Sequence, residues 1–550
     1  MTTYLPSRFR LKSEPRLALQ LVKTIQNPVL RGFNPDPSFL RVGDDYYIAT
    51  STFEWFPGVQ IHHSKDLVNW RLIGHGLRDK IRLDLTSVPD SGGIWAPSLS
   101  WNEGKFFLVY TIVHTFKWGC KFKDTHNYLI TAENIEGPWS IPVHLNSSGF
   151  DPSLFHDDDG RKWLVNMEWD FRKEMPRFGG IIIQEYDLPK NQLIGPIHKI
   201  LKKQELIEGP NLYKKNGYYY LMIAQGGTDW NHSITMSRSK TITGPYEVDP
   251  QEYVLTSRDD QKLELQKAGH GELIETPAGN WYLAHLCSRP VGPHRRCILG
   301  RETAIQEVYW SEDGWLRLSA GGVHPQVEVP APEQLPWTPW PTEPNRDQFE
   351  DAVLSSHWSS LRVPIDESWL TLKERPGWLR LRGRESLRSI HEQSIVARRL
   401  QEFKVIAETC LEFTPTHFTQ MAGLICWYDT NTHYYLRITY DEKFGKVLGI
   451  ILNDDGEYDE LSESQICIEN WNKCYLRAAI DHEKLQFSFS QDANIWQELG
   501  PVLDMTKLSD DYGREGLHFT GAFIGLCAQD LGGLKKTADF DYFEIQSSEK

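Results

Sequence analysis

Three carboxylates stand just before short strand-like segments, and together they could carry out acid–base chemistry. They are Asp36 in NPDPSFL, Asp151 in FDPSLF and Glu208 in EGPNLY. Two carboxyl groups can break a glycosidic bond, because one protonates the departing oxygen while the other activates a water molecule. A third carboxylate nearby raises the pKa of the proton donor and keeps it protonated near neutral pH. The three acids therefore predict hydrolysis of a sugar bond, provided that the fold brings them together.

An ordinary structural role competes with this interpretation for each acid, since an Asp before Pro commonly starts a strand through an Asx turn. The segments IWAPSLSW and GHGELI place Trp95 and His270 at the positions that the acids occupy in the other three segments. This alignment counts the distance to the next glycine, and aligning the prolines instead shifts two segments by one residue. Under either alignment the five side chains are expected to cluster.

An internal repeat indicates which elements position these residues. A turn glycine followed by an aromatic-rich strand recurs at intervals of about 60 residues, in VGDDYYIAT, EGKFFLVYT, DGRKWLVNM, NGYYYLMIA and AGNWYLAHL. Such spacing is typical of a β-propeller, in which each repeat forms one four-stranded blade and the innermost strands surround a central axis. Five copies predict five blades, with the segments before each glycine converging at the axis.

The rest of the chain divides around a proline-rich segment. Seven of the 31 prolines lie between Pro325 and Pro344, which predicts a stiff linker over 325–345. Beyond it, over 346–550, alternating strands such as YYLRITY and KLQFSFS occur without the repeat. We therefore expect an all-β protein, with an N-terminal extension over 1–27, a five-bladed propeller catalytic domain over 28–324, and an antiparallel β-sandwich after the linker.

Composition argues against several classes of function. The 59 Lys and Arg against 74 Asp and Glu give a net charge of -15, opposite to that of most nucleic-acid-binding chains. Mean hydropathy is -0.47, and no apolar run has the length of a membrane span, so no membrane partner is expected. The eight cysteines form no CxxC pair, which argues against a zinc cluster or a disulfide framework. The N-terminal residues lack the apolar core of a secretory signal, and we expect a cytoplasmic location.

Several motifs resemble those of glycoside hydrolase family 43, in particular its two-domain β-xylosidases. The resemblance runs from about residue 27 to the C-terminal region, through NPDPSFL, GGIWAPSLSW, FDPSLFHDDDG, EGPNLY, KAGHGELIETPAGNWYLAHL, LGRETAIQEVYW and FTGAFIGLCAQD. It implies that Asp36 is the general base and Glu208 the general acid, and that Asp151 tunes the pKa of Glu208 and orients it.

The same resemblance assigns substrate-binding residues. Arg301, in LGRETAIQ, corresponds to an arginine that binds sugar hydroxyls, while Trp95 and Phe53 correspond to aromatic walls around the terminal sugar. Phe519 is the candidate for a residue that the sandwich inserts to narrow the pocket, and Phe523 is its competitor. His270 matches an axis histidine that reaches either a buried calcium ion or a water molecule, and both readings stay open. No cofactor is expected to be required for the chemistry.

The activity implied is that of an exo-acting β-D-xylosidase, which removes xylose from the nonreducing ends of β-1,4-linked xylo-oligosaccharides with inversion. An α-L-arabinofuranosidase, alone or as a second activity, is the closest alternative, because the same family contains both. A non-catalytic sugar-binding propeller is a more distant one. The resemblance is also compatible with a homo-oligomer, about which the sequence itself is silent.

Overall fold

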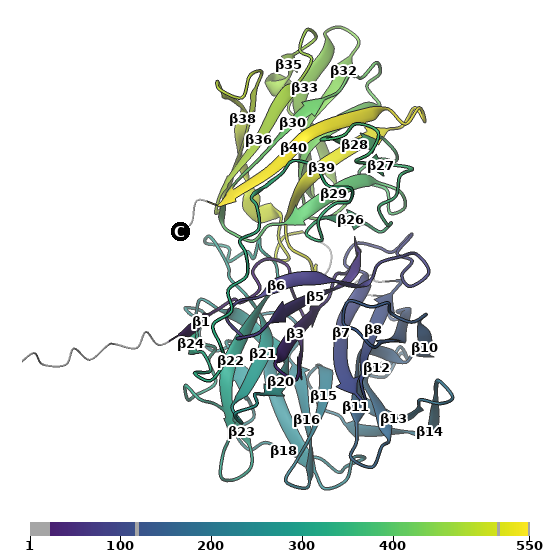
Figure 1. Ribbon diagram of the computed structural model, residues 1–550, viewed down its shortest axis with the longest axis vertical. Helices are drawn as coiled ribbons and strands as arrows, with labels where there is room; N and C mark the ends of the chain where they lie inside the picture. Colours follow the sequence, from purple (N-terminus) through teal and green to yellow (C-terminus); the bar gives the residue numbers. More distant parts are fainter. Residues whose placement is uncertain (1–22, 116–119, 514–517, 548–550) are drawn as a thin grey trace, which may run out of the picture.

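A computed structural model describes residues 23–115, 120–513 and 518–547 and consists almost entirely of β-strands. Figure 1 shows two β units in contact, with the N-terminal unit below and the C-terminal unit above. The only helices among the described residues are the short 3-10 turns η1 (Ser462–Ser464) and η2 (Met505–Lys507). No helix in this part of the chain is long and apolar enough to cross a membrane.

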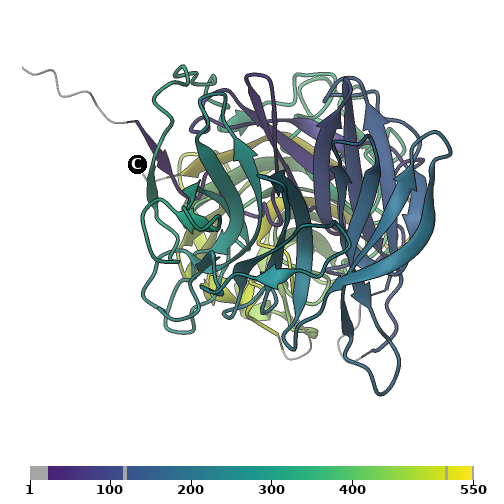
Figure 2. The same cartoon turned by 90° about the horizontal axis from the view of Figure 1, so that it is seen from below.

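The N-terminal unit is a five-bladed propeller, as predicted. Figure 2 shows its five sheets around a common centre in chain order, and in each sheet neighbouring strands are antiparallel. Blade 1 contains β2 (Ser38–Val42), β3 (Asp45–Thr50), β5 (Gly58–Ser64) and β6 (Arg71–Leu77); blade 2 contains β7 (Gly93–Asn102), β8 (Lys105–Val113), β9 (Thr125–Ala132) and β10 (Val143–Asn146); blade 3 contains β11 (Gly149–His156), β12 (Lys162–Trp169), β13 (Phe178–Asp187) and β14 (Gln192–Leu201); blade 4 contains β15 (Ile207–Lys215), β16 (Tyr218–Gln225), β17 (Ser233–Ser239), β18 (Glu247–Val248) and β19 (Leu255–Thr256); blade 5 contains β20 (Gln266–Glu275), β21 (Trp281–Ser288), β22 (Glu302–Trp310) and β23 (Leu316–Leu318).

The repeated glycines lie in the turn between the first two strands of each blade. All five have a positive φ, between 62° and 87°, a backbone conformation that glycine adopts without steric cost. The aromatic residues that follow them enter the second strand, where Phe107, Trp163, Tyr220 and Tyr282 are buried between blades. The repeat thus encodes one tight hairpin and one packed strand in each blade. The five glycines are Gly43, Gly104, Gly160, Gly217 and Gly279.

Contacts between the first and last blades close the ring. The Glu272 carboxylate of blade 5 accepts hydrogen bonds from the Ser38 hydroxyl (2.6 Å) and the Phe39 amide (2.5 Å) of blade 1. Outside the blades, β1 (Thr24–Gln26) pairs with β24 (Glu328–Pro330). The end of the segment expected as an extension therefore forms a small sheet with the segment expected as a linker, while residues 1–22 lie outside the described residues.

The C-terminal unit is a sandwich of two antiparallel sheets around a large apolar core. One sheet contains β25 (Arg346–Asp347), β27 (Leu370–Thr371), β28 (Leu379–Arg382), β30 (Lys404–Glu412), β36 (Cys474–Asp481), β37 (Lys484–Ser490), β38 (Gln497–Asp504) and β40 (Thr537–Ser547). The other contains β26 (Ser359–Leu361), β29 (Ser394–Arg399), β31 (Gln420–Trp427), β32 (His433–Asp441), β33 (Gly445–Asp454), β34 (Glu457–Glu460), β35 (Ile466–Cys467) and β39 (Phe523–Asp530).

The second sheet of the sandwich also includes a piece of the propeller. The two-residue strand β4 (Trp55–Phe56) leaves blade 1 and pairs with β26. Its Trp55 ring is fully buried and stacks on Phe523 of β39, with 3.8 Å between ring centroids. The two units therefore share backbone hydrogen bonds and an apolar core at their junction.

Candidate active site

A pocket lies between the inner ends of the blades and a loop of the sandwich. It is lined by Asp36, Phe53, Trp95, Phe150, Asp151, Glu208, Thr228, His270, Arg301 and Phe519. The fold thus gathers all eight residues singled out in the sequence into one place. Nine of the ten come from the propeller, and Phe519 comes from the sandwich.

The backbone at the start of each innermost strand explains this convergence. One residue per blade has a positive φ: Asp36 (54°), Ala96 (24°), Asp151 (54°), Gly209 (55°) and His270 (41°). In blades 2 to 5 this residue falls within a bulge of the first strand, where the register shifts. Such a kink turns two successive side chains toward the axis end.

The equivalence of positions expected from the glycine distances is wrong in two blades. Trp95 and Glu208 precede the positive-φ residue of their blades, whereas Asp36, Asp151 and His270 occupy it. Aligning the prolines is therefore correct for blades 2 and 4. The corrected alignment also shows that Phe150, Trp95 and Glu208 hold equivalent positions, and all three line the pocket.

Asp36 is held by two donors at the bottom of the pocket. Its carboxylate accepts hydrogen bonds from the Ser51 hydroxyl (2.7 Å) and from Nη1 of Arg301 (2.8 Å), and Nδ1 of His270 lies 3.9 Å away. Arg301 is 3% exposed, and its other nitrogen, Nη2, donates to the backbone oxygen of Phe519 (3.0 Å). One guanidinium thus connects the carboxylate to the sandwich loop.

Glu208 and Asp151 are the two acids whose pKa values are raised. Glu208 is partly accessible through the pocket but is otherwise surrounded by protein, and this burial, with the negative charge of Asp36, raises its pKa to about 7. Burial also raises the pKa of Asp151, with further contributions from Glu208 and Asp36, while His270 opposes the shift. The Asp151 carboxylate accepts a hydrogen bond from the amide of Gly209 (3.0 Å), next to Glu208. The pocket therefore holds two carboxyl groups that stay protonated to a higher pH than usual, beside the arginine-bound carboxylate of Asp36.

Aromatic rings form the walls. The Phe519 ring lies 5.9 Å from Phe53 and 5.5 Å from Trp95, and Phe150 packs edge-on against Trp95 at 5.2 Å. The backbone amide of Phe519 donates to the Ser91 hydroxyl (3.1 Å), which fixes the loop against the propeller. Phe523, the competing candidate, is buried in the stack with Trp55 and does not line the pocket. Such walls suit the apolar faces of a sugar ring.

Comparison with known proteins agrees with this architecture. The family model for glycosyl hydrolases family 43 matches residues 25–316, and the β-xylosidase C-terminal concanavalin A-like domain matches residues 346–546. This chain belongs to glycosyl hydrolases family 43. The family 43 chain is 48% identical to a xylan 1,3-beta-xylosidase of a Vibrio species, with 95% of this chain and 99% of that protein covered.

Two further relatives also match this chain over nearly its whole length. The xylosidase/arabinosidase 43B of Humicola insolens is 48% identical over 94% of this chain and 97% of its own length. The crystal structure of a xylan beta-1,4-xylosidase from Bacillus halodurans superposes with a TM-score of 0.93 at 55% identity, covering 95% of this chain and 100% of that one.

Three residues of the family 43 site were missed in the sequence. Phe150 and Thr228 line the pocket, and Lys123 lies over the rings of Trp95 (4.6 Å) and Phe150 (4.9 Å). Burial lowers the pKa of Lys123 to about 8, although the charges of Glu208 and Asp151 act in the opposite direction. Phe150 could have been found from the proline alignment. Thr228 and Lys123 lie in loops outside the repeat and carry no such signal.

His270 is the residue at which the family resemblance implies a calcium ion, and calcium prefers six to eight oxygen ligands. Within the described ranges, no group of three or more His, Cys, Asp or Glu side chains is arranged to hold a metal ion. The acid–base chemistry proposed for this site uses the protein's own carboxyl groups. A calcium ion at His270 stays a prediction from the resemblance alone.

Proposed function

We propose that this family 43 hydrolase is an exo-acting β-D-xylosidase that releases xylose from the nonreducing ends of β-1,4-linked xylo-oligosaccharides with inversion. The observation that carries the proposal is the pairing of a raised-pKa carboxyl, Glu208, with an arginine-bound carboxylate, Asp36, in one aromatic-walled pocket. The xylosidase relatives support the choice of sugar.

In the proposed reaction Glu208 donates its proton to the glycosidic oxygen as the bond to the anomeric carbon breaks. A water molecule attacks that carbon from the opposite face and transfers a proton to Asp36. In this proposal Asp151 keeps Glu208 in position through the Gly209 amide, while burial and the negative charge of Asp36 favour the protonated form of Glu208. Arg301 orients Asp36 and contacts the sugar hydroxyls.

The exo mode follows from the closed end of the pocket. Phe519 and the Arg301 contact to its backbone oxygen cover the side that faces the sandwich. A polymer chain that passed through the site would have to displace this loop, whereas a chain end fits beneath it. Single xylose units are therefore the expected product.

Proton NMR of the enzyme with β-1,4-xylobiose tests the proposal. We expect an early excess of α-xylose over its equilibrium share, before mutarotation mixes the anomers, because the water attacks the nonreducing-end unit opposite to the leaving group. The other xylose, the former reducing end, is released as its equilibrium mixture of anomers. An early excess of β-xylose over its equilibrium share would mean retention and would remove Asp36 from the role of general base. Release of no xylose from xylobiose would overturn the assignment of substrate.

A second activity, removal of α-L-arabinofuranose, is favoured by the similarity to the xylosidase/arabinosidase of Humicola insolens. Matched 4-nitrophenyl β-D-xyloside and α-L-arabinofuranoside, assayed side by side, distinguish the two activities. Because the Vibrio relative is named for 1,3-linked xylan, β-1,3-xylobiose belongs in the same experiment. A higher kcat/KM on β-1,3- than on β-1,4-xylobiose would correct the proposed linkage.

A further inference from the structure

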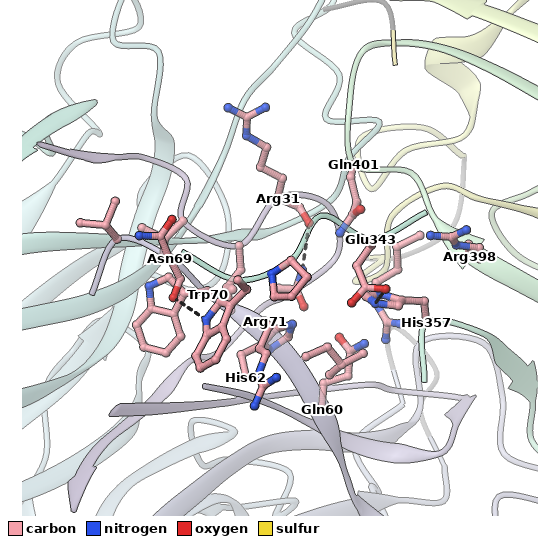
Figure 3. Close-up of a pocket in the computed structure, with 18 residues that line it drawn as sticks. Arg31, Gln60, His62, Asn69, Trp70, Arg71, Glu343, His357, Arg398 and Gln401 are labelled. Carbon is pink, nitrogen blue, oxygen red and sulfur yellow. Dashed lines mark hydrogen bonds and ion pairs between the residues drawn. The ribbon is translucent and has the colours of Figure 1, made fainter. Parts of the chain in front are cut away.

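A second cavity lies where the propeller, the linker and the sandwich meet. Its volume is about 440 Å³, within the usual range for small-molecule sites. Figure 3 shows that its lining comes from three parts of the chain: Arg31, Gln60, His62 and Arg71 from the propeller, Glu343 from the linker, and His357 and Arg398 from the sandwich. None of these residues lines the pocket that holds Asp36 and Glu208.

The most unusual group in this cavity is Arg399, at the end of β29. It is 7% exposed, and its guanidinium donates hydrogen bonds to the Phe33 backbone oxygen (2.9 Å) and the Ser359 hydroxyl (3.2 Å). Its Nη2 has no hydrogen-bond partner, and no carboxylate of the described residues forms an ion pair with it. Burial alone lowers its pKa to about 9. A buried cation without a counter-charge is costly, so a bound anion would stabilise it.

Further polar atoms at the cavity are also without partners. Oδ1 of Asn34, Oε1 of Gln60 and Nδ1 of His62 are buried and form no hydrogen bond within the described part of the protein. These three side chains are 2%, 3% and 8% exposed. Burial, with the charge of Arg399, lowers the pKa of His62 to about 3, so its ring is neutral and offers one donor and one acceptor. Buried polar groups in this number normally satisfy one another or a ligand.

The charges around the cavity are mainly positive. Four arginines line it against one carboxylate, Glu343, in a protein whose net charge is -15. Arg31 already pairs with Glu402 (2.5 Å), and Arg71 stacks over the ring of Trp340 at 3.9 Å. Arg71, Arg398 and Arg399 are therefore the arginines at the cavity without an ion-pair partner among the residues described here.

We propose that this cavity is a binding site for a small oxyanion, a phosphate or a carboxylate carried by a monosaccharide-sized molecule. The guanidinium of Arg398 binds the anionic oxygens, because its planar fork of donors matches their geometry, and the buried charge of Arg399 beside it adds attraction. Arg71 adds positive charge at the cavity wall. The Trp70 and Trp340 rings at the cavity supply apolar contact. The occupied site would hold propeller, linker and sandwich together.

Isothermal titration calorimetry of the full chain tests the proposal, with inorganic phosphate, glucuronate and neutral xylose as probes. The titrations with the two anions are made at constant ionic strength and with saturating xylose, which occupies the catalytic pocket. We expect one anion site with a dissociation constant of about 1 mM or tighter, and a rise in Tm in the presence of the anion. Tighter binding of phosphate would identify a phosphate group as the ligand chemistry, and tighter binding of glucuronate an acidic sugar. No binding of either anion would overturn the proposal.

Variants locate the site. Arg398→Gln and Arg71→Gln should each weaken anion binding about tenfold, whereas Arg161→Gln, which removes an exposed propeller arginine paired with Asp159, should leave it unchanged. All three should keep the wild-type kcat/KM on xylobiose, because none contacts the catalytic pocket. Equal anion affinity in all three variants would place the anion elsewhere and reject the proposal.

Crystals of the wild-type enzyme soaked in selenate give an independent readout that does not depend on a variant. An anomalous peak within hydrogen-bond distance of the Arg398 guanidinium is expected. Its absence at a selenate concentration well above the measured dissociation constant would reject the site, even if phosphate binds in solution.

Discussion

Burial and the negative charge of Asp36 raise the pKa of the Glu208 carboxyl from 4.5 to about 7. As the proton donor it is active only when protonated, so kcat/KM on xylobiose should fall about tenfold per pH unit above pH 7. In Glu208→Gln this dependence should disappear together with most of the activity, with kcat/KM reduced about 10²- to 10⁴-fold. A pH–rate profile of both proteins checks this prediction, and an unchanged alkaline limb in the variant would contradict it.

The same shift has a consequence for stability. Between pH 4.5, the value for the unfolded chain, and pH 7, the folded protein binds more protons at Glu208 than the unfolded protein does. Stability therefore falls as pH rises through this window. Glu208→Gln removes the titrating group, and at pH 8 its free energy of unfolding should exceed that of the wild type by about 1 to 3 kcal/mol. At pH 4 the two proteins should have the same Tm, which is the control.

Arg301 should not tolerate replacement by lysine. Its two terminal nitrogens reach the Asp36 carboxylate and the Phe519 backbone oxygen at once, and a lysine ammonium cannot keep both contacts. The loss of one charged hydrogen bond in the transition state lowers kcat/KM by about 10- to 100-fold. Arg301→Lys should therefore lower kcat/KM by at least tenfold. Arg289→Lys, which alters a buried ion pair with Glu302 outside the pocket, is the matched control and should retain most of the activity.

For single residues, the sequence predicts the membership of the pocket where a residue lies in a motif. Asp36, Asp151, Glu208 and Arg301 stand in segments whose spacing or resemblance sets them apart, and all four line one pocket. Lys123 could not be found in this way, because it lies on a loop whose path depends on packing against three aromatic rings. Its nearness to the acids follows from tertiary structure alone.

Among the elements, β39 and the loop that leads into it each carry a phenylalanine, and the two have different roles. Phe519 lies at the pocket wall, and Phe523 lies four residues later in the stack with Trp55. Phe519→Ala should lower kcat/KM on xylobiose about tenfold and change Tm little, because the ring is partly exposed. Phe523→Ala should instead destabilise the fold by about 3 to 5 kcal/mol, since it leaves a cavity in a buried core.

Kinetics and thermal unfolding of the two variants distinguish these outcomes. Similar losses of stability in both variants would mean that Phe519 serves packing and not the pocket.

The elements themselves were predictable to different degrees. The five hairpins could be predicted from the sequence, because each repeats a turn glycine and a buried aromatic residue at a regular interval. The strand β4 could not be predicted, since its two residues, Trp55 and Phe56, pair with a strand about 300 residues later in the chain. The one-residue error in blades 2 and 4 has a physical cause: the loop between the first two strands has two residues in these blades but five in blades 3 and 5, so the distance from the glycine back to the bulge differs.

In the whole molecule, ion pairs link the propeller to the sandwich close to the pocket. The Asp90 carboxylate binds Nη2 of Arg362 (2.7 Å), and the Asp511 carboxylate binds Nζ of Lys267 (2.5 Å). Replacing one partner leaves a buried charge uncompensated, which costs about 3 to 5 kcal/mol. Wild-type enzyme should therefore unfold in one calorimetric transition, and the double variant Asp90→Asn/Asp511→Asn should unfold in two.

The double variant should also lose activity, because Asp511 lies in the segment that leads toward Phe519. A single transition in both proteins would show that the apolar junction alone couples the units. A homo-oligomer and a cytoplasmic location stay predictions from the sequence.

The strand β4 has a consequence for recombining enzymes of this family. Trp55 and Phe56 belong to the propeller by position in the chain, but they lie in a sandwich sheet, directly after the pocket residue Phe53. A chimera joined within the linker would combine the β4 of one parent with the β26 and β39 of another. Such a hybrid should require exchange of residues 53–56 together with the sandwich, so the unit of inheritance is discontinuous in the gene.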